Sequence, residues 1–328
     1  MAIRSPFALA AIAATAILGV QPAALACGTC GCGLPGSNAE VTSFANGVTL
    51  FDTGNAGKFL IQTTLSFRDI TGNFNDRGVW SEKPVGSSLT TVQGNLGITY
   101  YPTDSWTLGV QLPLASSRLY GAQWGPYGSV SSAFFDDEDN PIGERTGGGL
   151  GDVSLQGSYL AFAGDDFLPS LALWAGAILP TGNAAGDPAA FTGSGVASGQ
   201  LGLSALKAYG PLELSASVGY QRPLTTPSVV SSAFYVGNSG LGQLQANLDL
   251  PAGLRLGLGV SAFRGFISGE NVAPSAESLG KLKVTPSVEW RFLPNQGLRV
   301  AYGADPSLGP WLNAMTDRTF YASYFCFL

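Results

Sequence analysis

The chain has 328 residues and a net charge of −6, and its composition excludes several classes of protein. Only 12% of its residues are charged and 45% are hydrophobic, whereas soluble domains carry about 25% charged residues. The acidic balance argues against nucleic-acid binding, which favours a basic surface. The 45 glycines and 20 prolines, without a long helical pattern, favour strands and turns.

Residues 1–26 have the features of a secretory signal peptide. Arg4 supplies the positive charge, an apolar run extends from Phe7 to Val20, and a small-residue cleavage site ends at Ala26. Cleavage there would leave Cys27 at the mature N-terminus, so a lipid anchor on Cys27 is an alternative. Past residue 26 no stretch of about 20 apolar residues predicts a membrane-spanning helix.

Residues 27–57 are a cysteine-rich N-terminal segment, expected to lie in the periplasm or to plug the interior of the next domain. The cysteines are Cys27, Cys30 and Cys32, with Cys326 near the end of the chain. In an oxidising periplasm they would form disulfides, and Cys27 with Cys30 and Cys32 with Cys326 is the least strained pairing. The same spacing suits a soft cation such as Cu(I) or Zn(II). No other cofactor is expected.

Residues 58–328 alternate apolar and polar side chains, the pattern of half-buried strands. The fold class predicted is all-β, a closed antiparallel transmembrane barrel of about twelve strands. The strands are expected near residues 58–68, 89–101, 106–116, 151–161, 169–180, 197–207, 212–222, 241–250, 254–264, 281–292, 298–303 and 319–328.

The connections between these strands alternate in length. The first, third and fifth are long, as in residues 69–88, 117–150 and 181–196, and the connections between them are tight turns such as 102–105. The order continues to the last strand. Outer-membrane barrels have short periplasmic turns, long external loops and an even number of strands. A secreted β-sandwich would also alternate apolar and polar residues, but its loops would not alternate between long and short.

The polar parity of the strands is expected to line the lumen. It carries amides and a mixture of charges, which suits a wet interior better than an open surface. Charged side chains on the lipid face would cost about 2–4 kcal/mol for Lys or Arg at mid-bilayer. The expected lumen-lining residues are Gln93, Asn95, Gln111, Glu213, Asp249, Arg255, Lys283, Glu289, Arg291 and Arg299.

Aromatic residues gather near the expected strand ends, which is typical of the girdles at the two membrane interfaces. They include Tyr100, Tyr101, Trp106, Tyr159, Tyr220, Trp290, Phe292, Tyr324, Phe325 and Phe327. The aromatic C-terminal strand resembles the segment by which the barrel-assembly machinery recognises outer-membrane proteins.

The chain contains no histidine. Catalysis by Ser-His or Asp-His pairs is therefore excluded, and we expect no enzymatic activity. The acidic run Asp136, Asp137, Glu138 and Asp139 lies in the longest expected external loop. Clustered carboxylates could bind a divalent cation, although a solvated acidic loop is the simpler explanation of them.

Several short glycine-containing motifs carry a resemblance to a known family. They are Gly147-Gly148-Gly149-Leu150-Gly151-Asp152, Leu179-Pro180-Thr181-Gly182, and the strand segments at 97–102 and 108–113. With these motifs the chain resembles the barrel family labelled for the meta-pathway of phenol degradation, which is similar to the long-chain fatty-acid transporters of the outer membrane. The resemblance implies uptake of aromatic or other hydrophobic solutes.

Two functions fit these observations. The first is an outer-membrane channel or transporter for small hydrophobic or aromatic solutes. The second is a structural sheath or partner for a periplasmic electron-transfer or metal-handling protein, with the cysteine cluster at the docking end. The expected partners are outer-membrane lipid, small solutes, the barrel-assembly machinery during biogenesis and, for the second function, a periplasmic protein.

Overall fold

The computed structural model describes residues 55–74, 79–82, 86, 88–120, 144–183, 192–193, 195–225, 235–268, 278–305 and 314–328. In these residues it contains the strands β1 (Phe59–Phe74), β2 (Trp80–Glu82), β3 (Ser88–Thr103), β4 (Trp106–Tyr120), β5 (Arg145–Leu150), β6 (Val153–Phe162), β7 (Ser170–Leu179), β8 (Ser198–Tyr209), β9 (Leu212–Pro223), β10 (Tyr235–Asp249), β11 (Leu254–Ser268), β12 (Ser278–Leu293), β13 (Gln296–Ala304) and β14 (Ala314–Phe327). A 3-10 turn, η2 (Pro251–Gly253), joins β10 to β11. None of the described helices is long and apolar enough to cross a membrane.

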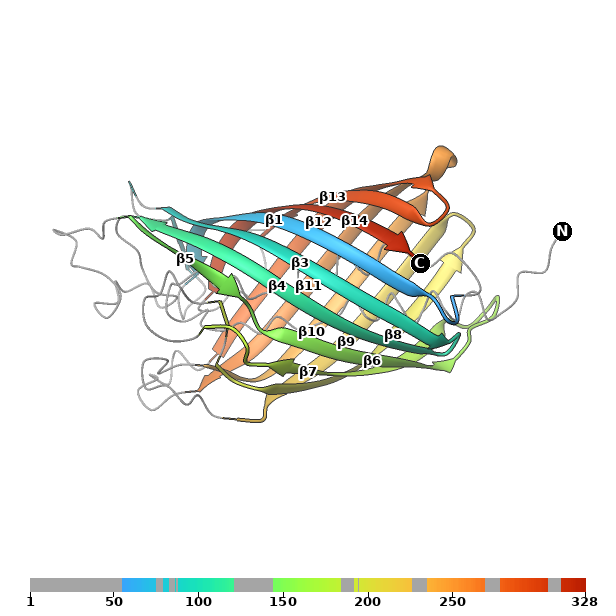
Figure 1. The fold of residues 1–328 in the computed structure, drawn as a ribbon, viewed down its shortest axis with the longest axis horizontal. Coiled ribbons are helices and arrows are strands. Elements are labelled where there is room, and N and C mark those ends of the chain that lie inside the picture. Colours follow the sequence, from blue (N-terminus) through green and yellow to red (C-terminus); the bar gives the residue numbers. More distant parts are fainter. Residues whose placement is uncertain are drawn as a thin grey trace.

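The strands form one antiparallel sheet that closes on itself. Neighbours along the chain pair with each other from β6 to β14, and β14 pairs with β1 along most of its length. In Figure 1 the strands wrap around a common axis with a marked tilt, and the C-terminus lies at the end where the short turns lie. We call this the short-turn end and the opposite end the long-loop end.

The structure confirms the closed antiparallel barrel of twelve wall strands. The wall strands are longer than expected at the long-loop end: β1 continues to Phe74, β10 begins at Tyr235 and β14 begins at Ala314. Outside the bilayer a strand pair needs only backbone hydrogen bonds, so it continues where the apolar alternation has ended. The register shift between Val236 and Ser239 lies in such an extension.

Two short strands were not expected from the sequence. β2 extends the hairpin of β1, and β5 pairs with β4 beyond the point where β6 begins. β5 and β6 are therefore two halves of one wall strand beside β4, with a break at Gly151. The amide of Gly151 donates to the carbonyl oxygen of Pro113 at 2.8 Å, so the break keeps one link to the wall.

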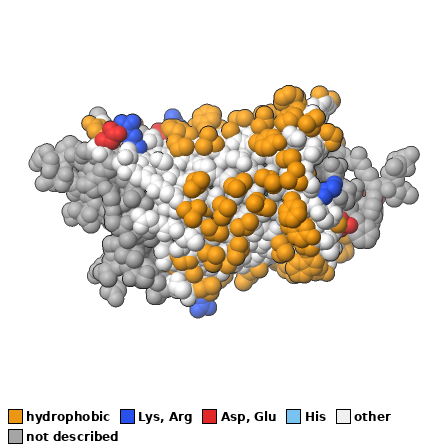
Figure 2. Space-filling view, viewed as in Figure 1, with side chains coloured by type: hydrophobic (Ala, Val, Ile, Leu, Met, Phe, Trp, Pro, Cys, Tyr) orange, Lys and Arg blue, Asp and Glu red, His pale blue; other side chains and the backbone are white. Residues whose placement is uncertain are grey.

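The leucine parity of the strands faces outward and the polar parity faces inward. At least half of the surface of Leu244, Leu258 and Val218 is exposed, while the polar neighbours Gln243 and Ser217 are buried. Hydrophobic side chains cover much of the visible wall, most densely towards the short-turn end (Figure 2). This is the inside-out arrangement that a barrel requires in lipid.

Most of the expected girdle aromatics lie on the outer face, but three do not. Phe59 stacks on Tyr100 with ring centroids 4.7 Å apart, and Trp106 lies 4.9 Å from Tyr159 near the same rim. Tyr101 and Phe325 instead point inward and form a buried cluster with Leu60, against which Phe327 also packs. Their position on the inward parity of β3 and β14 explains the difference, because alternate residues of a strand face opposite sides.

The turn between β10 and β11 contains the one described non-glycine residue with a left-handed backbone. Ala252 has φ 63° and ψ 24°, and Gly253 follows with φ 73°. The side chain of an alanine makes this conformation unfavourable by about 1 kcal/mol or more. A Cβ at Gly253 would run into the carbonyl oxygen of Arg291 on β12.

Replacing Ala252 with glycine should therefore stabilise the barrel by up to about 1 kcal/mol, because the strain is removed. Replacing Gly253 with alanine should destabilise it by more than about 1 kcal/mol, because the new Cβ would add a steric clash to the strain of the left-handed backbone. Urea unfolding in detergent, followed by heat-modifiable gel migration, measures both. Equal stability of the two variants would contradict this account of the turn.

Candidate functional site

The inner face of the barrel is the candidate site, and the structure places the ten expected lumen residues on its inward parity. Eight of them are buried: Gln93, Asn95, Gln111, Glu213, Arg255, Lys283, Glu289 and Arg299. The other two, Asp249 and Arg291, are partly exposed close to the short-turn rim. The charged members fall into two groups on one side of the barrel, from β9 round to β1.

The first group is a row of alternating charges near the short-turn end. One line of directly paired residues crosses β10 to β13 and carries Asp249, Arg255, Glu289 and Arg299 in that order. We call this line the charge row. Because each charge stands beside neighbours of opposite sign, the row is internally neutral.

Specific contacts hold the charge row in place. The Nε of Arg255 donates to Asp249 at 2.7 Å, and its Nη1 lies 3.4 Å from Glu213 on β9. The Nε of Arg291 donates to Glu289 at 2.9 Å. Burying an ion costs several kcal/mol unless it is paired, so these contacts explain how the charges are tolerated with so little solvent exposure.

The second group of charges joins the strands where the barrel closes. Asp317 of β14 is completely buried and accepts from Lys283 on β12 at 2.7 Å. Arg68 of β1 reaches the other carboxylate oxygen at 2.6 Å, and Thr319 donates to the same oxygen as Lys283. A single carboxylate therefore links β12, β14 and β1. The alternation of residues predicts Lys283 on the inner face, but it identifies neither Asp317 as its partner nor Arg68 as the second cation on that carboxylate.

The opposite wall, from β3 to β9, is lined mainly by amides and hydroxyls. Asn95 donates to Gln111 at 3.2 Å, and Gln200 donates to Gln221 at 3.2 Å. Thr107 and Ser158 share a hydrogen bond of 2.7 Å. The lumen is thus asymmetric, with paired charges on one side and neutral hydrogen-bonding groups on the other.

Two of the motifs that carried the family resemblance, at 147–152 and 179–182, meet at the long-loop end. The hydroxyl of Thr181 donates to the carbonyl oxygen of Gly151 at 2.7 Å and accepts from the amide of Val153 at 2.9 Å. The buried carboxylate of Asp152 accepts from the amide of Gly182 at 3.0 Å. These contacts fasten the base of the loop after β7 to the break between β5 and β6. The motifs therefore have a structural role in this chain.

Several expected sites fall outside the described residues. Cys27, Cys30 and Cys32 lie there, as do Asp136, Asp137, Glu138 and Asp139, so the disulfide, metal and divalent-ion assignments stay predictions. Cys326 is described as a free, partly buried thiol on the outward parity of β14. Within the part of the chain that the structure describes, no three His, Cys, Asp or Glu side chains are grouped as a metal site.

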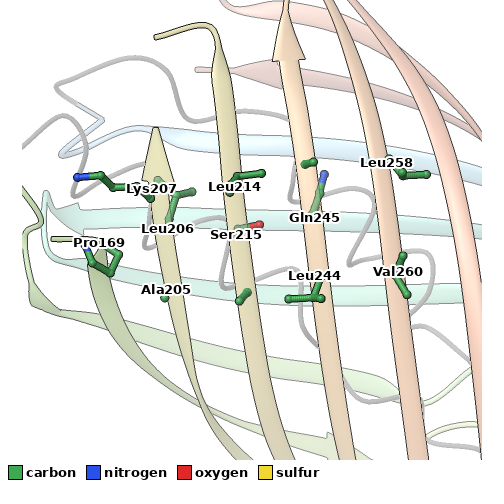
Figure 3. Close-up of a pocket in the computed structure, with 12 residues that line it drawn as sticks. Pro169, Ala205, Leu206, Lys207, Leu214, Ser215, Leu244, Gln245, Leu258 and Val260 are labelled. Carbon is green, nitrogen blue, oxygen red and sulfur yellow. The ribbon is translucent and has the colours of Figure 1, made fainter. Parts of the chain in front are cut away.

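A groove of about 470 Å³ lies on the outer face of the barrel. In Figure 3, Pro169 and Lys207 lie at one side of it and Leu258 and Val260 at the other. The groove is lined almost wholly by apolar atoms of the outward parity. The amine of Lys207 donates to the carbonyl oxygen of Asp165 at 2.6 Å, in the turn after β6. The groove belongs to the outer surface and is separate from the lumen.

The lumen also has an apolar part that was not expected from the sequence. Trp174 on β7 is buried on the inward parity, and so is Phe263 on β11. Ring atoms of Trp174 occupy the space in which a Cβ of Gly202 or Gly219 would lie. Two inward-facing glycines in neighbouring strands are the signal that could have revealed a large side chain lying across them.

The contribution of the buried ion pair between Arg255 and Glu213 to the stability of the barrel can be compared with that of an exposed ion pair. Replacing Arg255 with methionine should destabilise the barrel by about 3–5 kcal/mol, because Glu213 would keep a buried charge without its cation. The side chains of Arg118 and Glu144 form a comparable pair at 2.9 Å but are 58% and 50% exposed.

Arg118→Met should therefore cost less than about 1 kcal/mol. Urea unfolding of both variants in the same detergent gives the comparison. A double variant, Arg255→Met with Glu213→Gln, should recover part of the loss. Similar losses of stability in Arg255→Met and Arg118→Met would show that the charge row is hydrated like an open surface.

Comparisons with known proteins agree with this architecture. The chain resembles an outer-membrane channel from Pseudomonas putida F1 with a TM-score of 0.63 and 18% identity, over 83% of this chain and 96% of that chain. The toluene transporter of P. putida matches at a TM-score of 0.38 and 11% identity, over 88% of this chain and 96% of that one. At 18% identity the likeness to the P. putida F1 channel concerns the fold alone. No curated protein sequence matches the chain.

The closed barrel, with apolar side chains outside and polar side chains inside, assigns the protein to the outer membrane. A family model described as "Putative MetA-pathway of phenol degradation" matches residues 114–305, more than half of the chain. That range runs from β4 to β13 and includes both glycine motifs and the charge row. The chain belongs to this family of outer-membrane β-barrels.

Proposed function

We propose that the protein is a passive channel that carries small, uncharged hydrophobic or aromatic solutes across the outer membrane. The observation that carries this proposal is the inner face of the closed barrel, which combines neutral hydrogen-bonding groups with charges that are paired in place. By the rule for outer-membrane barrels, the short turns face the periplasm and the long loops face outward.

The charge row supports a preference for uncharged solutes. With Glu213 and Arg291, it comprises three carboxylates and three guanidinium groups, so no net charge remains to concentrate ions of one sign. Pores that select ions usually present rings of one charge. A nearly neutral lining offers little attraction to an anion or a cation.

The aromatic part of the proposal has two supports. The description of the family refers to phenol degradation, and the lumen contains buried aromatic side chains, Trp174 and Phe263. Binding sites for such solutes combine apolar surface with a few polar groups. The fold is also similar to that of a protein described as an outer-membrane channel.

Uptake by whole cells tests the function directly, because the lipopolysaccharide layer slows hydrophobic solutes. Cells that lack their own copy and express this chain should take up radiolabelled phenol several-fold faster than cells carrying the empty vector. Uptake of labelled glutamate should be unchanged. Equal uptake of phenol with and without the chain would contradict the proposal.

A matched pair of variants identifies the route. Gln93 faces inward on β3 and its neighbour Val92 faces outward, so the same tryptophan substitution can be placed on either face. Gln93→Trp should lower phenol uptake and single-channel conductance several-fold, while Val92→Trp should leave both close to wild type. Equal effects would mean that solute does not pass through the lumen.

The sheath function rests on Cys27, Cys30 and Cys32, and no described contact favours it. The free thiol of Cys326 lies on the outer face near the short-turn rim, so a bond to the N-terminal segment would run outside the lumen. Mass spectrometry of the mature protein without reductant distinguishes a disulfide from a bound soft metal and from a lipid on Cys27.

A further inference from the structure

An apolar strip crosses the inner wall at about the middle height of β7. It follows one line of directly paired residues over five strands: Trp174, Gly202, Gly219, Leu241 and Phe263. Its side-chain members, Trp174, Leu241 and Phe263, all lie on the inward parity, and we call them the luminal patch. No other line of the inner wall described above combines an indole, an aliphatic chain and a phenyl ring.

The two glycines determine how the indole lies. A Cβ on Gly202 would meet the ring atoms Cε2 and Cζ2 of Trp174, and a Cβ on Gly219 would meet Cζ2 and Cη2. The six-membered ring therefore lies across β8 and reaches β9. Gly219 is directly paired with Leu241 on β10, and Leu241 with Phe263 on β11, so the ring extends along the strip towards these two residues.

Polar atoms without a partner border the luminal patch. They are the Nε1 of Trp174 and the hydroxyl oxygens of Ser204, Ser217 and Ser239, none of which has a hydrogen bond among the described residues. Ser204 and Ser217 are directly paired on one side of the strip, and Ser239 lies on the other. Each of the four residues is more than nine-tenths buried.

Buried polar groups in native proteins are almost always hydrogen-bonded. Four unpaired groups around one apolar strip suit a bound molecule that has both an apolar body and an oxygen atom. On β7 to β10 the residues beside the strip carry no charge: they are Ala172, Gly176, Gln200, Ser204, Ser217, Gln221, Ser239 and Gln243. The part of the site on β7 to β10 therefore offers nothing to neutralise an ionic group, and the paired line reaches a charged residue only beyond Phe263, at Lys281 of β12.

We propose that the luminal patch is a solute-binding site that takes a small neutral aromatic molecule bearing a hydroxyl group. The ring of the solute packs against Trp174, Leu241 and Phe263, and its hydroxyl group is hydrogen-bonded by Ser204, Ser217 or the indole N–H. This inference rests on the proposed channel function and adds the position and chemistry of the site within the pore.

Equilibrium binding to the purified, folded barrel in detergent tests the site, with phenol as the probe and saturation-transfer NMR or dialysis as the readout. Wild type should bind phenol more tightly than toluene, which lacks the hydroxyl group, and than cyclohexanol, which lacks the aromatic ring. Trp174→Leu should weaken phenol binding about five- to tenfold, in line with the strength of aromatic contacts.

The polar groups that border the luminal patch are tested separately. Ser204→Ala with Ser217→Ala should abolish the preference for phenol over toluene while leaving toluene binding nearly unchanged. Trp174→Phe keeps a ring and removes the N–H, so its effect should be smaller than that of Trp174→Leu. Trp106→Leu, on the outer face, is the matched control and should bind phenol like wild type.

The outcomes separate the site from the channel function. Equal phenol affinity in wild type and in folded Trp174→Leu and Trp174→Phe would overturn the site, even if whole-cell phenol uptake persists. Absence of binding to wild type would overturn it as well. Phenol binding that depends on Trp174, combined with no uptake by cells, would support the site and overturn the channel. Should Trp174→Leu not fold, Leu241→Ser carries the same comparison.

Discussion

The closure of the sheet by β14 and β1 is the constraint on which the rest of the structure depends. In lipid, an unpaired backbone amide or carbonyl costs several kcal/mol, so every wall strand needs two neighbours. The pairing of β1 with β14 supplies the last neighbour. The ion contacts of Asp317 with Lys283 and Arg68 span the same place, so side chains reinforce the step that makes the barrel complete.

Once the sheet is closed, the two faces of each strand meet different surroundings. The outward parity accepts leucines and aromatics, and the inward parity accepts groups that would be unfavourable in lipid. The charges of the inner wall are concentrated between β9 and β1, and the amides lie opposite. The luminal patch lies between β7 and β11, on the wall where the two regions meet. A solute that passes along it would encounter apolar and hydrogen-bonding surfaces together.

The strand positions and the facing of their side chains could be predicted because both follow from a two-residue period. That period placed Arg255 and Glu289 on the inner face without any knowledge of their partners. It could not give the pairing between Lys283 and Asp317, because register between strands far apart in sequence is fixed by the whole barrel. The sequence contains the glycines at 202 and 219, but only the register between the strands shows that they lie beside Trp174. The break in the wall strand at Gly151 could not be predicted for the same reason.

The charge row has a consequence for the electric field inside the pore. Neighbouring strands are about 4.8 Å apart, so the sign of the charge reverses at each step across β10 to β13. The potential of such an alternating array cancels within roughly one strand spacing of the wall. A molecule on the axis experiences almost none of it, whereas a molecule that touches the wall meets a steep local gradient. Such a surface turns permanent dipoles without attracting ions, so it would orient a neutral polar solute during its passage.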